Sequence, residues 1–244
     1  MSERGRAPKI TRRRSSFFSP SPSPPPPAEP EQRAYVEDHR HLSMIRQLEW
    51  ADWITMLNCY CGFNSIISSA RYITHSYHLE KYTYRAMMFT FAGFFFDVFD
   101  GRVARWQGKS SLLGKELDSL ADLVSFGVAP ATIAFTLGLQ STLDLLILSF
   151  FVLCGLLRLA RFNVTAAILS KGQAKVQFFE GIPIPSSLGL VGLMGWLVHS
   201  GRIFANLPGG LWFAGEVYEL HPFSLVFFLH GCAYISKTVR IPKL

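Results

Sequence analysis

Hydrophobic residues occur in long blocks along this chain, and not in the short alternating or helical patterns of a soluble domain. From residue 53 onward the blocks are roughly 17 to 24 residues long, the length that a helix needs to cross a hydrocarbon layer about 30 Å thick. Six such blocks lie near residues 53–73, 84–106, 117–139, 143–164, 183–200 and 220–236. The pattern therefore predicts an all-α, polytopic membrane protein with about six transmembrane helices.

The chain outside these blocks divides into a tail and a short helix. Residues 1–33 are basic and rich in Pro and Ser, so they cannot bury a core, and we predict a disordered tail. A phosphorylation site at Ser15 and Ser16, or an anionic-lipid contact at Arg12–Arg14, is the alternative to a merely solvated tail. No apolar stretch follows the basic start, which argues against a secretory signal. Residues 34–50 mix apolar and charged positions at helical spacing and predict an interfacial amphipathic helix before the transmembrane domain, residues 51–244. Residues 207–217 could lie at the interface or extend the last span.

The formal net charge of +7 raises the question of nucleic acid, but the basic residues fall in separate short connections and form no stripe with interleaved aromatics. We therefore expect no nucleic-acid partner. The distribution instead follows the rule that short cytoplasmic loops of membrane proteins collect Lys and Arg. The amino-terminal tail, the carboxyl terminus and the connection between the second and third spans would then face the cytoplasm.

The four cysteines lie inside apolar blocks, at positions 59, 61, 154 and 232. This placement argues against a disulfide framework, and the spacing of the first two lacks the companion ligands of a structural zinc site.

Four aspartates stand where the second block ends and the third begins. Asp97 and Asp100 are three residues apart, and Asp118 and Asp122 are four apart, so each pair shares one helix face. An acid at the centre of a membrane helix costs roughly 2.5 to 3.5 kcal/mol, so something must offset the cost of four. One hypothesis is an ion-pair network with nearby arginines. The other is a cation site, because an all-oxygen ligand set favours Mg²⁺ or Mn²⁺, and four carboxylates suit two ions about 3.5 to 4 Å apart.

Small residues beside the acids leave room for a large ligand, since Gly101, Ala104 and Gly114 lack bulky side chains. The acids and these residues together match the signature D-x2-D-G-x2-A-R-x8-G-x3-D-x3-D, which is that of the CDP-alcohol phosphotransferases. The chain resembles this family at every fixed position. The resemblance implies a membrane enzyme that moves a phosphatidyl group from CDP-diacylglycerol to an alcohol with two metal ions, Mg²⁺ or Mn²⁺.

Roles for individual residues follow from the same resemblance. It implies that Asp97, Asp100, Asp118 and Asp122 bind metal, with Asp118 and Asp122 catalytic and Asp122 the base toward the acceptor hydroxyl. The CDP-diacylglycerol site would comprise Asp100, Gly101, Arg102, Ala104, Arg105 and Gly114.

The acceptor alcohol is suggested by strings outside the signature. The sequences around the aspartates, RLARFN at 158–163 and FFEGIPIPSS at 178–187 resemble the phosphatidylserine synthases of this family. Arg158 and Arg161 share a helix face, and a guanidinium pairs with carboxylate or phosphate in a fork geometry. We assign both, with Phe162, to L-serine or to the donor phosphate; the alternative is that the arginines only anchor the span. The prolines of the second string could shape the same pocket or start a helix.

Thr55 and Asn58 are polar residues one helical turn apart in the first block. They could hydrogen-bond a neighbouring helix or border the nucleotide site, and we favour packing between helices.

The resemblance further implies the endoplasmic reticulum membrane, a cytoplasmic active site, membrane lipids as surroundings and a homodimer. Three alternatives remain at this stage. The acceptor could be inositol, glycerol phosphate or ethanolamine phosphate; the aspartates could belong to a divalent-cation transporter; or the chain could be a scaffold with a degenerate site, which an intact motif disfavours.

Overall fold

The computed structural model of this chain describes residues 45, 48–74, 79–107, 112–170, 178–215, 218–236, 238 and 240–242. Residues 47–244 form one compact unit, and all structural statements below concern it. The predicted disordered tail and almost all of the predicted interfacial helix lie outside the described residues.

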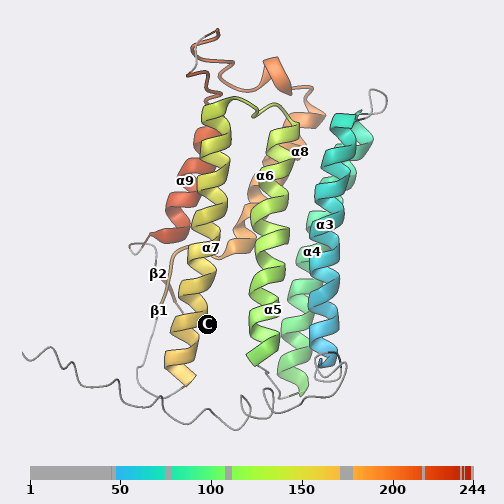
Figure 1. The fold of residues 1–244 in the computed structure, drawn as a ribbon, viewed down its shortest axis with the longest axis vertical. Helices are drawn as coiled ribbons and strands as arrows, with labels where there is room; N and C mark the ends of the chain where they lie inside the picture. The colour runs from blue at the N-terminus through green and yellow to red at the C-terminus, as the bar shows by residue number, and fades with distance from the viewer. Residues whose placement is uncertain are drawn as a thin grey trace, which may run out of the picture. The chain divides into compact units, whose positions relative to one another are not determined.

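Among the described residues, six main helical segments lie in this unit, and each coincides with one of the predicted blocks (Figure 1). The first two are α3 (Trp50–Thr74) and α4 (Leu79–Gln107). The third consists of α5 (Leu112–Asp122), the π-helix η1 (Leu123–Val128) and α6 (Ala129–Thr136) without a break. The others are α7 (Thr142–Ser170), α8 (Ser187–His199) after the 3₁₀ turn η2 (Ile184–Ser186), and α9 (Ser224–Ile235). The prediction of a helical protein is confirmed.

Two short strands are an addition to the predicted all-α class. β1 (Phe178–Glu180) pairs with β2 (Arg240–Pro242) in antiparallel register, so Phe179 stands opposite Ile241. The strands lie outside the apolar blocks, where the hydrophobic pattern carried no signal.

Within the described part of the chain, two helical stretches are long and apolar enough to cross a membrane, Leu113–Thr136 and Thr142–Ala166. The apolar stretches at Ile184–His199 and Ser224–Ile235 are shorter. Twelve residues of α9 measure about 18 Å at 1.5 Å per residue, less than the thickness of the hydrocarbon layer. The helical segments therefore agree with the sequence, while the count of six membrane spans stays a prediction.

The stretch before α9 does not extend that helix, so one of the two interpretations of residues 207–217 is wrong. Gly209, Gly210, Phe213 and Gly215 all have positive φ angles, which a right-handed helix does not accept. The chain instead makes turns and a single bridge between Trp212 and Leu220. The helix consequently begins at Ser224, four residues later than the predicted block.

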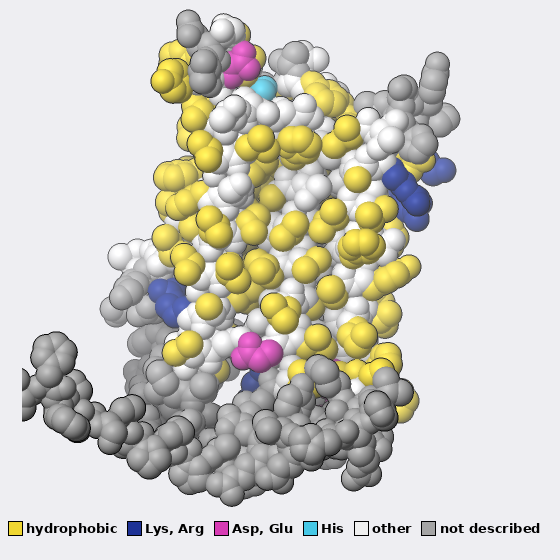
Figure 2. All heavy atoms as spheres, in the orientation of Figure 1, with side chains coloured by type: hydrophobic (Ala, Val, Ile, Leu, Met, Phe, Trp, Pro, Cys, Tyr) yellow, Lys and Arg dark blue, Asp and Glu magenta, His cyan; other side chains and the backbone are white. Residues whose placement is uncertain are grey.

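The outer surface of the helices is largely apolar. Figure 2 shows hydrophobic side chains spread over the middle of the visible face, with charged side chains towards its margins. On α7, Leu146, Leu153 and Leu157 are each more than half exposed. Exposed apolar area of this extent marks a surface that contacts lipid or another protein.

The first two helices are held together by small and hydroxyl-bearing residues. α3 turns Gly62, Ser65 and Ser69 toward the protein interior, and the Ser65 hydroxyl lies 3.0 Å from that of Thr90 on α4. Small residues let helix backbones approach closely, as in membrane helix pairs. On the other side of the unit, α7 packs against α9 through an edge-to-face contact of Phe151 with Phe227. Because α3 packs against both α4 and α5, the parts of these two helices that carry the aspartates lie beside α3.

A buried polar cluster closes the opposite end of the unit. Asp144, at the start of α7, is completely buried and accepts from His221 Nδ1 at 2.6 Å and from the His221 backbone N–H at 3.1 Å. The Ser141 hydroxyl caps the same helix by accepting from the Asp144 N–H. This cluster fixes the loop before α9 to the start of α7.

Candidate active site

The four aspartates of the signature meet where the second half of α4 faces the second half of α5. Asp97 and Asp100 lie near the C-terminus of α4, and Asp118 and Asp122 lie on α5. Carboxylate oxygens of Asp97, Asp100 and Asp118 all lie within 4.8 Å of one another. Asp122 is also buried, at 8% exposed, and lies beside Asp97. The spacing of two pairs on adjacent helices thus brings all four carboxylates into one cluster.

Helix α3 supplies a hydrogen-bond donor to each of the two facing helices. The Thr55 hydroxyl donates to Asp100 Oδ2 at 2.7 Å, and Asn58 Nδ2 donates to Asp122 Oδ1 at 3.3 Å. Both residues are buried. Thr55 and Asn58 therefore hydrogen-bond to neighbouring helices, as the sequence suggested, and their partners are two of the signature aspartates.

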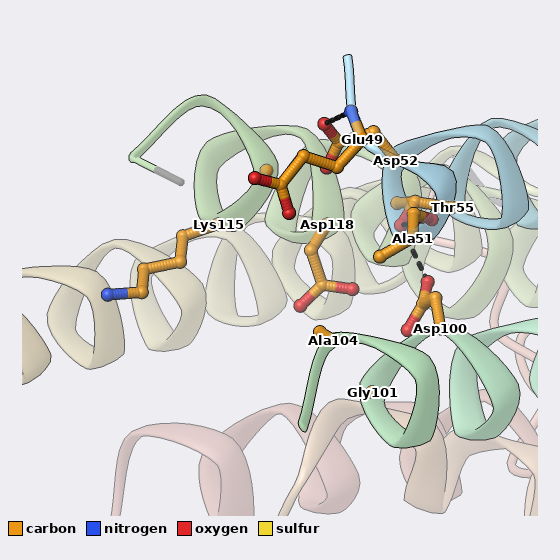
Figure 3. Close-up of a pocket in the computed structure, with 10 residues that line it drawn as sticks. Glu49, Ala51, Asp52, Thr55, Asp100, Gly101, Ala104, Lys115 and Asp118 are labelled. Carbon is orange, nitrogen blue, oxygen red and sulfur yellow. Dashed lines mark hydrogen bonds between the residues drawn. The ribbon is translucent and has the colours of Figure 1, made fainter. Parts of the chain in front are cut away.

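A cavity of about 110 Å³ opens between the start of α3 and the ends of α4 and α5. Figure 3 shows Asp100 and Asp118 facing it from different helices, with Thr55 bonded to Asp100 and Lys115 extending away from the acids. The lining residues from α4 and α5 are Asp100, Gly101, Ala104, Gly114, Lys115 and Asp118, and those from the start of α3 are Glu49, Ala51, Asp52 and Thr55.

Two acids at the cavity, Glu49 and Asp52, were not predicted from the sequence. Asp52 is 4% exposed, and its Oδ2 accepts from the Glu49 N–H at 2.8 Å, which caps the first turn of α3. The signal available in the sequence was its position three residues before Thr55, on the same helix face.

The chemistry of the cluster fits a divalent cation. Asp118 Oδ1 is buried and has no hydrogen-bond partner among the described residues. Arg102 and Arg105 are exposed, and in the part of the chain that is described no ion pair joins either to a signature aspartate. The arginine network proposed as an alternative therefore has no support in this structure. Clustered carboxylate oxygens are the ligands that Mg²⁺ or Mn²⁺ takes.

The residues assigned to the CDP moiety separate into two groups. Gly101, Ala104 and Gly114 line the cavity, whereas Arg102 and Arg105 do not. A Cβ added to Gly101 would lie 3.6 Å from Arg105 Nη1, so that guanidinium lies near the cavity rim. The small residues provide the room and Arg105 a cation beside it.

The arginines assigned to the acceptor lie on α7 at the same end of the unit. The Arg158 guanidinium stands over the Phe162 ring at 5.6 Å and is close enough to Asp122 for their charges to interact. Arg161 lies beside the turn after β1, where its Nη2 is 3.4 Å from the place a Cβ on Gly181 would take. With a φ of +81°, Gly181 is suited to this turn. The structure thus brings Arg158 toward the aspartates and Arg161 toward the β1–η2 turn.

Comparison with known proteins agrees with this site. The profile of the CDP-alcohol phosphatidyltransferase family matches residues 48–221. The CDP-diacylglycerol–serine O-phosphatidyltransferase of Saccharomyces cerevisiae is 52% identical over 238 residues, which cover 96% of this chain and 85% of the yeast protein. The enzyme of the same name from Methanocaldococcus jannaschii is 34% identical, covering 79% of this chain and 84% of that protein.

A third relative, named archaetidylserine synthase, comes from Methanothermobacter thermautotrophicus and is 36% identical over 55% of this chain and 52% of its own length. The family match covers α3 to α8 with all four aspartates, and it extends to His221. The chain belongs to the CDP-alcohol phosphatidyltransferase family.

Proposed function

We propose that this protein transfers the phosphatidyl group of CDP-diacylglycerol to L-serine, forming phosphatidylserine and CMP. The observation that carries the proposal is the cluster of carboxylates beside a cavity bordered by glycine and alanine, in which the buried Asp118 Oδ1 has no hydrogen-bond partner within the described ranges. Two relatives named for this reaction, each aligned over more than three quarters of both chains, support serine as the acceptor.

The carboxylates of Asp97, Asp100, Asp118 and Asp122 would hold two divalent cations, Mg²⁺ or Mn²⁺. Such ions supply positive charge that offsets the charge of the pyrophosphate and of the departing CMP. The fit rests on the oxygen-only donor set and on the unpaired Asp118 Oδ1.

The nucleotide end of the donor would occupy the cavity, because Gly101, Ala104 and Gly114 leave its wall open to a large group. Arg105, at the rim, would pair with a phosphate oxygen. The lipid chains of the donor would run along the apolar outer surface of the helices. This arrangement keeps the reactive phosphorus beside the aspartates.

Asp122 would act as the base toward the serine hydroxyl. A carboxylate about 3 Å from a hydroxyl takes its proton as the oxygen attacks, so Asp122 receives the proton while a new phosphorus–oxygen bond forms to serine. The bond between the β-phosphorus and the bridging oxygen breaks, and its electron pair leaves with CMP. Burial of Asp122 excludes water, which would otherwise compete with serine for the phosphorus.

Arg158 and Arg161, with Phe162, would recognise the serine. The carboxylate of serine is a partner that inositol and glycerol phosphate lack, and Arg158 already lies within electrostatic reach of Asp122. Stacking of its guanidinium over Phe162 would orient the fork toward the acceptor. The residues proposed to recognise serine therefore all lie on α7.

We place the protein as a six-span protein of the endoplasmic reticulum membrane, functioning as a homodimer with the aspartates on the cytoplasmic side. The Lys and Arg residues in connections on one side and the apolar surface of the helices support the membrane spans and the cytoplasmic side, whereas the endoplasmic reticulum and the homodimer rest on the family resemblance. On that side the water-soluble serine reaches the site from the cytoplasm, while the donor arrives within the membrane.

The test uses purified protein in lipid vesicles with CDP-diacylglycerol, Mn²⁺ and each labelled alcohol in turn: serine, inositol, glycerol phosphate and ethanolamine phosphate. We expect one labelled lipid, phosphatidylserine, and its loss in Asp122→Asn. A lipid product with another alcohol and none with serine would reassign the acceptor. Cation flux across the vesicle membrane without any CDP-lipid would instead revive the transporter hypothesis.

A further inference from the structure

We infer that Thr55 and Asn58 are positioning residues, which hold the carboxylates of Asp100 and Asp122 in the orientation that the cations require. This inference rests on the proposed function, because it concerns the same site. Helix α3 carries none of the eight signature positions. The inference gives this helix the role of fixing the aspartates of α4 and α5.

The first observation is that two residues on one face of α3 hydrogen-bond to two different helices. Thr55 and Asn58 are three residues apart and share one face, yet Thr55 donates to α4 and Asn58 donates to α5. Their exposed fractions are 3% and 0%, so water does not compete for these hydrogen bonds. Figure 3 shows the Thr55 hydroxyl bonded to Asp100 at the wall of the cavity. One helix therefore anchors one aspartate of each pair.

The second observation is that Asn58 is closely packed and that its amide nitrogen donates to Asp122. Its backbone carbonyl accepts from the Ser125 hydroxyl at 3.0 Å, and a Cβ on Gly93 would lie 2.9 Å from its Oδ1. A carboxylate only accepts hydrogen bonds, so the amide must present its nitrogen to Asp122. Asn58 Oδ1 has no hydrogen-bond partner among the described residues, which leaves Asp122 as the partner that fixes the amide.

The third observation is the π-helix that begins directly after Asp122. Ser125 lies within it and reaches Asn58, so the distortion of the helix and the anchor on α3 occur at the same place. Short π-helical turns occur frequently at functional sites, where they reorient side chains. Here the distorted turn joins the base-bearing helix to α3.

The chemical consequence is that one oxygen of each carboxylate is held by a donor on α3, which fixes the orientation of the whole carboxylate group. Thr55 binds Oδ2 of Asp100, and Asn58 binds Oδ1 of Asp122. Groups that hydrogen-bond metal ligands fix the orientation of those ligands, and their loss lowers metal affinity by about 10- to 100-fold. If Thr55 and Asn58 only packed helices together, replacing them would lower the stability of the protein and leave its cation affinity unchanged.

The protein contains a closely matched control for Thr55. Thr90 is also a buried threonine at the contact of α3 and α4, and its hydroxyl pairs with Ser65 at 3.0 Å. Each threonine hydroxyl also lies near the carbonyl four residues earlier, Ala51 for Thr55 and Ala86 for Thr90. The two differ in that the partner of Thr55 is a signature aspartate.

The experiment compares Thr55→Val with Thr90→Val in detergent-purified protein. Two quantities are measured: the Kd for Mn²⁺ alone, from the electron paramagnetic resonance signal of the free ion, and the unfolding temperature without metal. We expect both variants to lose similar stability, while Thr55→Val alone binds Mn²⁺ about 10- to 100-fold more weakly. Thr55→Ser keeps the hydroxyl and should bind as the wild type does.

Asn58→Leu, which removes the donor at similar volume, should weaken Mn²⁺ binding in the same way. Equal Mn²⁺ affinity in Thr55→Val, Asn58→Leu and Thr90→Val would overturn the positioning role and leave the proposed function standing. A wild-type protein that binds no Mn²⁺ and forms no phosphatidylserine would overturn the proposed function itself.

Discussion

Gly62 on α3 is the position where the smallest change should produce the largest effect on the site. Its missing side chain lets α3 lie directly against Ser125 in the π-helix after Asp122. In Gly62→Ala, the added Cβ would lie 2.9 Å from Ser125 Cα and 3.0 Å from Ser125 N, and closer still to its hydroxyl oxygen. Ordinary contacts of a Cβ begin at 3.4 Å, so the two helices must separate by the difference.

The expected magnitude follows from the fact that the clash is with backbone. A side chain could rotate away, whereas helix backbones cannot, and overpacking of this kind costs about 1–3 kcal/mol. For a protein of this size the unfolding temperature falls by about 2–4 °C per kcal/mol. The same separation pulls Ser125 from the Asn58 carbonyl, so the turnover number should fall as well.

Gly192→Ala is the control, because a Cβ at that position of α8 meets nothing within 4 Å. Alanine is favoured over glycine inside a helix by about 1 kcal/mol, so this variant should be as stable as the wild type or more so. Thermal unfolding in detergent, followed by tryptophan fluorescence, measures both. If Gly62→Ala unfolds at the wild-type temperature with unchanged turnover, the close contact of α3 with the π-helix is refuted.

Three further predictions concern other parts of the molecule. His221→Ala should destabilise the protein by about 1–3 kcal/mol, because it removes the ring nitrogen that hydrogen-bonds the buried Asp144 carboxylate; thermal unfolding measures this, and an unchanged KM for serine separates it from the site. Arg158→Ala should raise the apparent KM for serine at least about tenfold, since a charge-assisted hydrogen bond contributes about 1.5–3 kcal/mol; Arg202→Ala, which removes a guanidinium stacked on Trp196, should not change it. Removal of divalent ions with EDTA should abolish transfer, and added Mn²⁺ or Mg²⁺ should restore it; transfer that persists after chelation would contradict the metal-dependent mechanism.

Much of the fold could be predicted because long apolar blocks leave few alternatives to a helix. All six blocks became helical segments, but their ends depended on local backbone geometry. The block at 220–236 lost its first turn, since glycines and Phe213 with positive φ produce turns before Ser224. The π-helix after Asp122 also had no local signal, because contacts of Ser125 with Gly62 and Asn58, more than sixty residues away, accompany it.

Some residues of the candidate site could likewise be predicted from the sequence, and others could not. The spacing within each aspartate pair follows helix periodicity, so their convergence could be predicted from sequence. Glu49 could not, because it precedes the first apolar block and reaches the cavity only when α3 packs against α4, and for Asp52 the one signal was its position on the helix face of Thr55. Thr55 and Asn58 were visible as polar positions on one face, but only the structure identifies Asp100 and Asp122 as their partners.

The central claim is that the aspartate cluster drives transfer from a CDP-linked lipid to serine. It is tested most directly by counting CMP and phosphatidylserine released by purified protein from CDP-diacylglycerol, serine and Mn²⁺, in the wild type and in Asp118→Asn. We predict equal amounts of the two products from the wild type, and neither from a variant that has the wild-type unfolding temperature without metal. Phosphatidylserine formed at the wild-type rate by Asp118→Asn, or CMP released without lipid product, would contradict the claim.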